Sequence, residues 1–177
     1  MTRPDILVRK ATLDDLKNIQ EVCEVVNQAY GPKGGWTSES FIEGDRMTEQ
    51  DMVNCIKENG NPYTLLFAME ADTIVGTIQV QPSEKVAHEA EFRLFSVSPF
   101  HQSKGIGGKL LKSALEEMKA TNKTHCVIRV FENRPELLNW YKKLGFVETG
   151  DRIPYPWPER LQTPNLDFLV MKKPLDD

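Results

Sequence analysis

The sequence predicts one domain of the α/β (α+β) class, spanning residues 1–177. This length is enough to build a single hydrophobic core. Segments with apolar residues at helical spacing are interleaved with short runs rich in β-branched and aromatic residues. Read along the chain, these segments predict the order β-α-α-β-β-β-α-β-α-β-β. No repeat, low-complexity tract or linker interrupts them, so no second domain is expected.

The first third of the chain is expected to form a strand, a helix, a loop and a second helix, over residues 6–10, 12–28, 30–45 and 48–56. Each helix begins with a capping box, in which a hydroxyl residue precedes an acidic residue by three positions. These pairs are Thr12 with Asp15 and Thr48 with Asp51. The loop contains a Gly-Pro step and a Gly-Gly pair, both of which favour irregular backbone.

The remaining strands are expected over residues 63–69, 73–80, 89–97, 126–130, 146–148 and 167–171, and the remaining helices over 106–118 and 135–144. Pro135 suits the first position of a helix, and Gly145 suits the residue after the last turn. Three prolines alternate with other residues between Ile153 and Pro158. Regular structure is therefore not expected in that segment.

The junction between the strand at 89–97 and the helix at 106–118 is the most informative segment. It carries the loop Gln102-Ser103-Lys104-Gly105-Ile106-Gly107-Gly108. The first N–H groups of a helix and its dipole attract anions such as a pyrophosphate. The spacing fits neither a Walker loop nor the dinucleotide fingerprint. At the position of Leu110 a Walker loop needs a hydroxyl residue, and the dinucleotide fingerprint needs a third glycine. The alternative is that the glycines only permit a short connection between strand and helix.

Composition narrows the class of protein. The net charge of −4 argues against a nucleic-acid-binding protein, which normally carries a basic patch. The three cysteines form no Cys-x-x-Cys pair and the three histidines are scattered, so no metal site is expected. The chain shows neither a signal-peptide pattern nor an apolar run of membrane-spanning length, so a cytoplasmic protein without membrane contact is expected.

Two segments resemble one known family. Gln102-x-x-Gly105-x-Gly107 resembles the Gln/Arg-x-x-Gly-x-Gly/Ala motif of the GNAT superfamily of acetyl-CoA-dependent N-acyltransferases. Asn133, followed by Tyr141-x-x-x-Gly145-Phe146, is similar to the second signature of that family. The resemblance covers nearly the whole chain. It implies a mixed, mostly antiparallel sheet of six to seven strands with helices on both faces.

The resemblance also implies where the cosubstrate acetyl-CoA binds. Its pyrophosphate would lie on the backbone amides of Gln102, Ser103, Lys104, Gly105, Ile106, Gly107 and Gly108. Its pantetheine arm would pair with the strand edge at Phe95 and Val97, and the Val97 N–H would polarise the thioester carbonyl. Asn133 matches a position that contacts the pantetheine, or it caps the helix at Pro135. The Lys104 side chain adds positive charge or is simply solvated.

Two side chains are candidates for proton transfer. Tyr141 matches the family position that faces the cofactor sulfur, where it would be the general acid; the alternative is a core aromatic. Glu91 matches the position where several family members place a catalytic glutamate, which would be the general base. The alternative is a salt bridge to Arg93 or a solvated carboxylate. Alternation along the strand predicts one face for Glu89, Glu91, Arg93, Phe95 and Val97.

The acceptor pocket is expected among three segments, residues 30–46, 82–88 and 153–159. The aromatic residues on these loops could form its wall: Tyr30, Trp36, Tyr155 and Trp157. Alternatively, they cover small apolar clusters under the loops. Glu43 or Asp45 could attract a cationic amine. Arg46 could pair with an acidic neighbour or bind a carboxylate of the substrate.

The expected function is an N-acetyltransferase that transfers an acetyl group from acetyl-CoA to a primary amine of a small metabolite. Direct attack in a ternary complex is expected, since no cysteine stands in an activating context. One alternative is a protein or peptide N-acetyltransferase, and another is a non-catalytic acyl-CoA sensor. Family members often form homodimers through their C-terminal strands, although no residue of this chain demands it.

Overall fold

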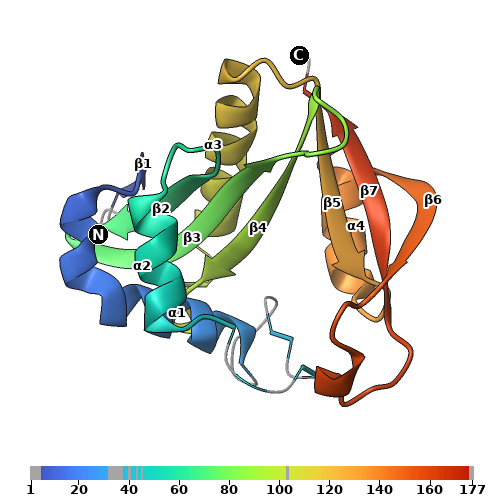
Figure 1. Cartoon of the computed structure of the whole chain (residues 1–177), viewed down its shortest axis with the longest axis horizontal. Helices are drawn as coiled ribbons and strands as arrows, with labels where there is room; N and C mark the ends of the chain where they lie inside the picture. Colours follow the sequence, from blue (N-terminus) through green and yellow to red (C-terminus); the bar gives the residue numbers. More distant parts are fainter. Residues whose placement is uncertain are drawn as a thin grey trace.

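A seven-stranded mixed sheet forms the centre of the molecule, in the order β1-β2-β3-β4-β5-β7-β6 (Figure 1). The computed structural model describes residues 5–31, 38–39, 41–42, 44, 46–102 and 104–175. The strands are β1 (Ile6–Lys10), β2 (Thr64–Glu70), β3 (Thr73–Pro82), β4 (Glu89–Val97), β5 (His125–Phe131), β6 (Val147–Pro154) and β7 (Asp167–Pro174). All neighbouring strands are antiparallel except β4 and β5. The predicted mixed, mostly antiparallel sheet is confirmed.

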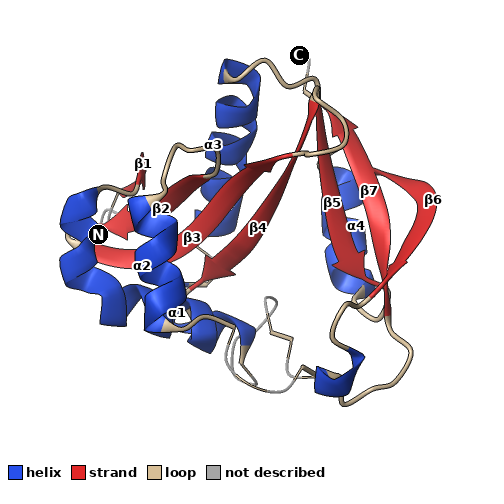
Figure 2. Cartoon of the chain, viewed as in Figure 1, coloured by secondary structure: helices blue, strands red, loops and turns tan. Residues whose placement is uncertain are grey.

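Helices cover both faces of the sheet (Figure 2). They are α1 (Ile19–Tyr30), α2 (Glu49–Lys57), α3 (Ile106–Ala120) and α4 (Pro135–Lys143). One core, around Phe67 and Met52, lies between the sheet and α1 and α2. The other, around Leu110 and Ile78, lies between the sheet and α3 and α4. Because the central strands are buried on both faces, they are apolar along most of their length.

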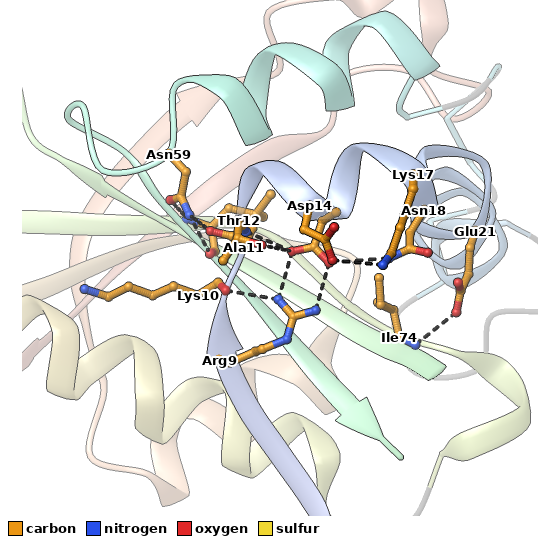
Figure 3. Close-up of polar contacts among 12 residues, drawn as sticks. Arg9, Lys10, Ala11, Thr12, Asp14, Lys17, Asn18, Glu21, Asn59 and Ile74 are labelled. Carbon is orange, nitrogen blue, oxygen red and sulfur yellow. Dashed lines mark hydrogen bonds and ion pairs between the residues drawn. The ribbon is translucent and has the colours of Figure 1, made fainter. Parts of the chain in front are cut away.

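The first predicted helix is divided into two parts. Residues Leu13–Asn18 form a 3-10 helix, and α1 follows it directly. Asp15 connects the start of the 3-10 helix to β1, since it accepts hydrogen bonds from both terminal nitrogens of Arg9 at 2.8 Å and from the Thr12 N–H at 2.8 Å. Figure 3 labels the two donors, Arg9 and Thr12. The predicted capping box is therefore present, and the side chain of Arg9 on β1 binds the same carboxylate.

The sheet opens between β4 and β5. These strands pair at three positions only, where Glu89, Ala90 and Glu91 lie opposite His125, Cys126 and Val127. Beyond Glu91 the two strands diverge, as Figure 1 shows. The side of β4 that faces β5 therefore has no strand partner from Phe92 onward in the described part of the chain.

A β-bulge interrupts β4 within this unpaired stretch. Thr77 and Gln79 of β3 pair with Ser96 and Arg93, so a single residue of β3 faces two residues of β4. The extra residue, Leu94, has a φ angle of +52°. Positive φ is uncommon for a residue with a side chain, and it is typical of bulges that redirect a strand.

The bulge changes which side chains share a face. Phe92 and, three residues later, Phe95 both belong to the core under α3 and α4. Leu94 packs on the opposite face with α1 and α2, and alternation places Glu91 and Arg93 on that face as well. The expectation of one common face is thus wrong, because the inserted residue separates Glu89, Glu91 and Arg93 from Phe95 and Val97.

A second correction concerns the proline-rich segment. Ile153 and Pro154 belong to β6, where they pair with Phe168 and Asp167. Because β6 is an edge strand and Pro154 is its last residue, the missing N–H of proline is tolerated there. Pro158 begins a 3-10 turn at Pro158–Arg160. In the described part of the chain, no helix has the length and apolarity needed to cross a membrane.

Candidate active site

The glycine loop meets the N-terminus of α3 as expected. Gly105 precedes the first residue of α3 and has a φ angle of +78°, which favours glycine. A Cβ atom added at Gly105 or at Gly108 would have no neighbour within 4 Å. The N–H groups of the first turn, from Ile106 to Gly108, have no acceptor within the helix and lie beside this open space. The loop can therefore receive an anionic group. Of its residues, Ser103 lies outside the described part of the chain.

Glu70, at the end of β2, binds the side chains of this loop. Its carboxylate lies 2.9 Å from His101 Nε2 and 3.6 Å from Lys104 Nζ. The other ring nitrogen of His101 lies 3.1 Å from the hydroxyl oxygen of Ser98, which directly follows β4. The Lys104 side chain is thus part of an ion pair rather than simply solvated. Sequence reasoning missed Glu70, because its strand lies far from the loop in the sequence.

A cavity of about 360 Å³ lies in the opening between β4 and β5. Seven of the predicted site residues line it: Tyr30, Arg46, Glu91, Phe95, Tyr141, Tyr155 and Trp157. Val97 is buried and does not line the cavity. Asn133 is exposed and does not line the cavity either. Arg134, not Asn133, is the residue that precedes α4, so the capping alternative for Asn133 is wrong. No residue of 82–88 lines the cavity, and Trp36, Glu43 and Asp45 lie outside the described residues.

Tyr30 connects α1 to the bulge of β4. Its hydroxyl donates a hydrogen bond of 2.8 Å to the carbonyl oxygen of Phe95. The guanidinium of Arg46 lies over its ring, 4.9 Å from the centroid. Burial raises the pKa of Tyr30 well above its usual value, with a smaller contribution from Glu39. Tyr30 is therefore a neutral hydrogen-bond donor that positions the strand edge, as well as part of the cavity wall.

A buried ionic cluster at one end of the cavity escaped the sequence analysis. Arg46 forms an ion pair with Glu39, as one of its two predicted roles requires, and it also lines the cavity. Arg134 pairs with Glu136 and donates to the carbonyl oxygen of Ser38. Burial raises the pKa of Glu39, and the charges of Arg46 and Arg134 oppose that rise. The cluster joins the segment before α2 to the start of α4.

Tyr141 lies on α4 and is 6% exposed. Its ring contacts Phe92 and Phe146, with centroids 6.1 and 5.5 Å away. Burial is the main cause that raises its pKa far above the usual value. In the described part of the chain its hydroxyl has no hydrogen-bond partner, although Tyr141 lines the cavity. A protonated hydroxyl that faces a cavity can donate a proton there.

Glu91 lines the cavity at the last paired position of β4, with 30% of its side chain exposed. Its Oε1 lies 3.5 Å from Nη2 of Arg129 on β5. The partner is thus Arg129 rather than the predicted Arg93. Because the two residues come from the two diverging strands, their contact marks the closed end of the opening.

Aromatic side chains from the C-terminal region form another wall. Phe131, Tyr155 and Phe168 contact one another, with ring centroids between 4.3 and 5.9 Å apart. Tyr155 is 5% exposed, and its buried hydroxyl has no hydrogen-bond partner in the described residues. Trp157 packs against Tyr155 and remains 53% exposed at the rim.

Three solved structures with the same fold are described as acetyltransferases. One of them is the yncA protein of Salmonella typhimurium, which is described as an acetyltransferase and was solved with its cofactor acetyl-CoA. It superposes with a TM-score of 0.74 at 19% identity, and the match covers 98% of this chain and 95% of the yncA chain. The ribosomal-protein-alanine N-acetyltransferase of Brucella melitensis has a TM-score of 0.73 and 20% identity, covering 95% and 99%. A protein described as a phosphinothricin N-acetyltransferase has a TM-score of 0.71 and 16% identity, covering 98% and 100%. At these identities the likeness shows the fold alone.

The family follows from the sequence comparison. The model of the acetyltransferase (GNAT) family matches residues 19–146, which run from the start of α1 to the end of the second signature. The matched segment contains the glycine loop, the opening between β4 and β5, and Tyr141. The chain therefore belongs to the acetyltransferase (GNAT) family and is a GNAT N-acetyltransferase.

Proposed function

We propose that this protein transfers the acetyl group of acetyl-CoA to a primary amine of a small metabolite by direct attack in a ternary complex. The observation that carries the proposal is the opening of the sheet. Residues of β4 beyond its last pair with β5 line a cavity of about 360 Å³, and the same strand continues through the glycine loop into the N-terminus of α3. An anionic cofactor and a second, smaller molecule can therefore meet within one site.

The residues at the loop fit acetyl-CoA. The open space before Gly105 and Gly108 leaves room for a diphosphate against the backbone N–H groups from Gln102 to Gly108. Beyond Glu91 the edge of β4 has no strand partner among the described residues, and the pantetheine arm would run along this edge past Phe95 and Val97. Acetyl-CoA would supply a thioester carbonyl, and the Val97 N–H would polarise it. Asn133 remains the proposed contact on the pantetheine side.

The transfer needs two proton movements. The amine must lose a proton before its nitrogen bonds to the acetyl carbon, and the C–S bond then breaks to release a thiolate that takes up a proton. We assign the first proton to Glu91, through a water molecule. The second comes from Tyr141, which lines the same cavity.

Covalent catalysis by cysteine has no support in the geometry. None of the three cysteines lines the cavity. Burial raises the pKa of Cys23 to about 11 and that of Cys126 further. Thiols with raised pKa values are poor nucleophiles at neutral pH. Direct attack of the amine on the thioester is the simpler route.

A screen of amines that records the release of the free CoA thiol tests this proposal. Transfer to small amines, with little transfer to peptides, is the expected result. Strong activity on peptides with none on small amines would replace a metabolite by a protein as the acceptor. Tight CoA binding without transfer to any amine would favour an acyl-CoA sensor instead.

A further inference from the structure

Arginine side chains dominate the charge of the cavity. Of the described residues that line it, Arg46, Arg93, Arg129 and Arg134 are basic, whereas only Glu39 and Glu91 are acidic. The whole chain, in contrast, carries a net charge of −4. A concentration of positive charge inside an acidic protein favours an anionic ligand at that place.

The arginines differ in how their charges are compensated. Arg46 and Arg134 belong to the buried ionic cluster and hold Glu39 and Glu136. Arg129 has only the 3.5 Å contact with Glu91. Among the residues that the structure describes, Arg93 has no ion-pair partner within 4.0 Å and donates no hydrogen bond. Its charge is therefore available to a ligand.

Strand register places the last two arginines on the same face of the sheet. Glu91 and Val127 are partners at the end of the parallel pairing. Arg93 and Arg129 each follow two residues later, so both return to the face that Glu91 occupies. They lie on the two strands just where these begin to diverge. This is the face of α1 and α2, away from Phe95 and the predicted pantetheine path.

The hydroxyl of Tyr155 supplies a second, independent indication of a ligand. The residue is 95% buried, lines the same cavity and leaves its hydroxyl without a partner in the described residues. Buried hydroxyl groups are normally hydrogen-bonded, because an unsatisfied one costs free energy. A ligand with an acceptor oxygen would satisfy it.

We propose that Arg93 and Arg129 form an anion subsite, so that the acceptor is a small molecule that carries both a primary amine and a carboxylate or phosphonate group, as an α-amino acid does. The inference rests on the acetyl transfer proposed above and names its substrate class. The anionic group would bind Arg93, with a bidentate geometry that guanidinium favours. The amine would then lie toward Glu91, one pleat away on the same face of β4.

Matched acceptors test the subsite directly. L-phenylalanine, its methyl ester, 2-phenylethylamine and the aminophosphonate analogue of phenylalanine share one ring and one amine but differ in the anionic group. For the wild-type enzyme, kcat/KM is expected to be about 10- to 100-fold higher for the anionic members, as a charge-assisted hydrogen bond provides. Comparison of the acid with the phosphonate identifies which anion the subsite prefers. The same series, built on other α-amino acids, covers acceptors of other sizes.

Variants of Arg93 separate this role from a general effect of charge. Arg93→Ala is expected to remove the preference for anionic acceptors while the KM for acetyl-CoA stays within about twofold. Arg93→Lys should keep part of the preference, and Arg93→Gln retains the length of the side chain if the alanine variant folds poorly. Lys85→Ala is the matched control, since Lys85 is an exposed cation that does not line the cavity.

The outcomes distinguish the two proposals. Equal or better transfer to the neutral amines, or an unchanged preference in Arg93→Ala, would overturn the anion subsite and leave the acetyl transfer standing. No transfer to any amine would overturn both, and a calorimetric titration with acetyl-CoA on the same sample would show whether cofactor binding fails with them. A preference for the anions that disappears in Arg93→Ala and persists in Lys85→Ala supports the subsite.

Discussion

The hydroxyl of Tyr30 donates a hydrogen bond of 2.8 Å to the carbonyl oxygen of Phe95, the residue that follows the bulge of β4. This contact joins the last turn of α1 to the strand edge that opens toward β5. A helix on one face of the sheet thereby positions backbone groups that the pantetheine arm is proposed to meet. The face of the sheet that α1 covers and the open edge of β4 are therefore connected at this point.

Removal of that hydroxyl should affect both stability and cofactor affinity. Tyr30→Phe is expected to lower the free energy of unfolding by about 1 kcal/mol, as the loss of one buried hydrogen bond does. It should also raise the KM for acetyl-CoA, because the edge at Phe95 is less firmly held. Denaturant unfolding and initial-rate kinetics measure the two effects. A loss of stability with an unchanged KM would restrict Tyr30 to a structural role.

Tyr141 is expected to act on catalysis and not on binding. Tyr141→Phe keeps the ring among Phe92 and Phe146 but removes the hydroxyl that faces the cavity. The kcat should fall by about 10²-fold, the lower range for a general acid, while the Kd for acetyl-CoA measured by calorimetry stays nearly constant. An unaltered kcat would remove Tyr141 from the mechanism.

Glu91 is expected to act on the chemical step. Because its carboxylate is proposed to take the amine proton through a water molecule, Glu91→Gln should lower kcat/KM for the amine by about 10²-fold, while the KM for acetyl-CoA stays nearly constant. Initial-rate kinetics on both proteins measure the effect. An unchanged kcat/KM in the variant would mean that water alone takes the proton.

Asp15 makes stability depend on pH at the opposite end of the sheet. The side chain is 2% exposed, and hydrogen bonds from Arg9, followed by that from Thr12, hold its pKa below the usual 3.8 against the opposing effect of burial. A group whose pKa is lowered by folding stabilises the protein above its unfolded pKa, and this contribution is lost as the pH falls through the folded value.

Asp15→Asn should therefore lower the free energy of unfolding by about 1 to 2 kcal/mol at pH 7, comparable to the loss of a helix cap. As the pH falls through the lowered pKa of the folded state, the difference from wild type should shrink, since the wild-type carboxyl then becomes protonated as well. Urea unfolding at several pH values measures this difference. Asp14→Asn is the matched control, because Asp14 is exposed and pairs only with Lys17. A difference that stays constant with pH would contradict the account.

Features that depend on local sequence were predictable. The two capping boxes, the glycine loop, the start of α4 at Pro135 and the positive φ of Gly145 follow from the residues themselves. Each depends on contacts between residues a few positions apart, so the local sequence contains the necessary information.

The bulge at Leu94 and the ionic cluster of Glu39, Arg46 and Arg134 were not predictable in this way. The bulge arises from the register between β3 and β4, and no glycine in β4 indicates it. The cluster joins two segments that lie far apart in the sequence, and the fold alone brings them together. The arginine pair could have been found, because Arg93 and Arg129 occupy equivalent positions after the last paired residues of two strands.

Binding of acetyl-CoA to the purified protein is the most direct measurement for the central claim, that the backbone at the start of α3 and the open edge of β4 hold this cofactor. An isothermal calorimetric titration should show a single class of saturable site, with competition by CoA. The absence of heat and of saturable binding would contradict the claim and with it the proposed roles of Glu91, Tyr141 and Val97.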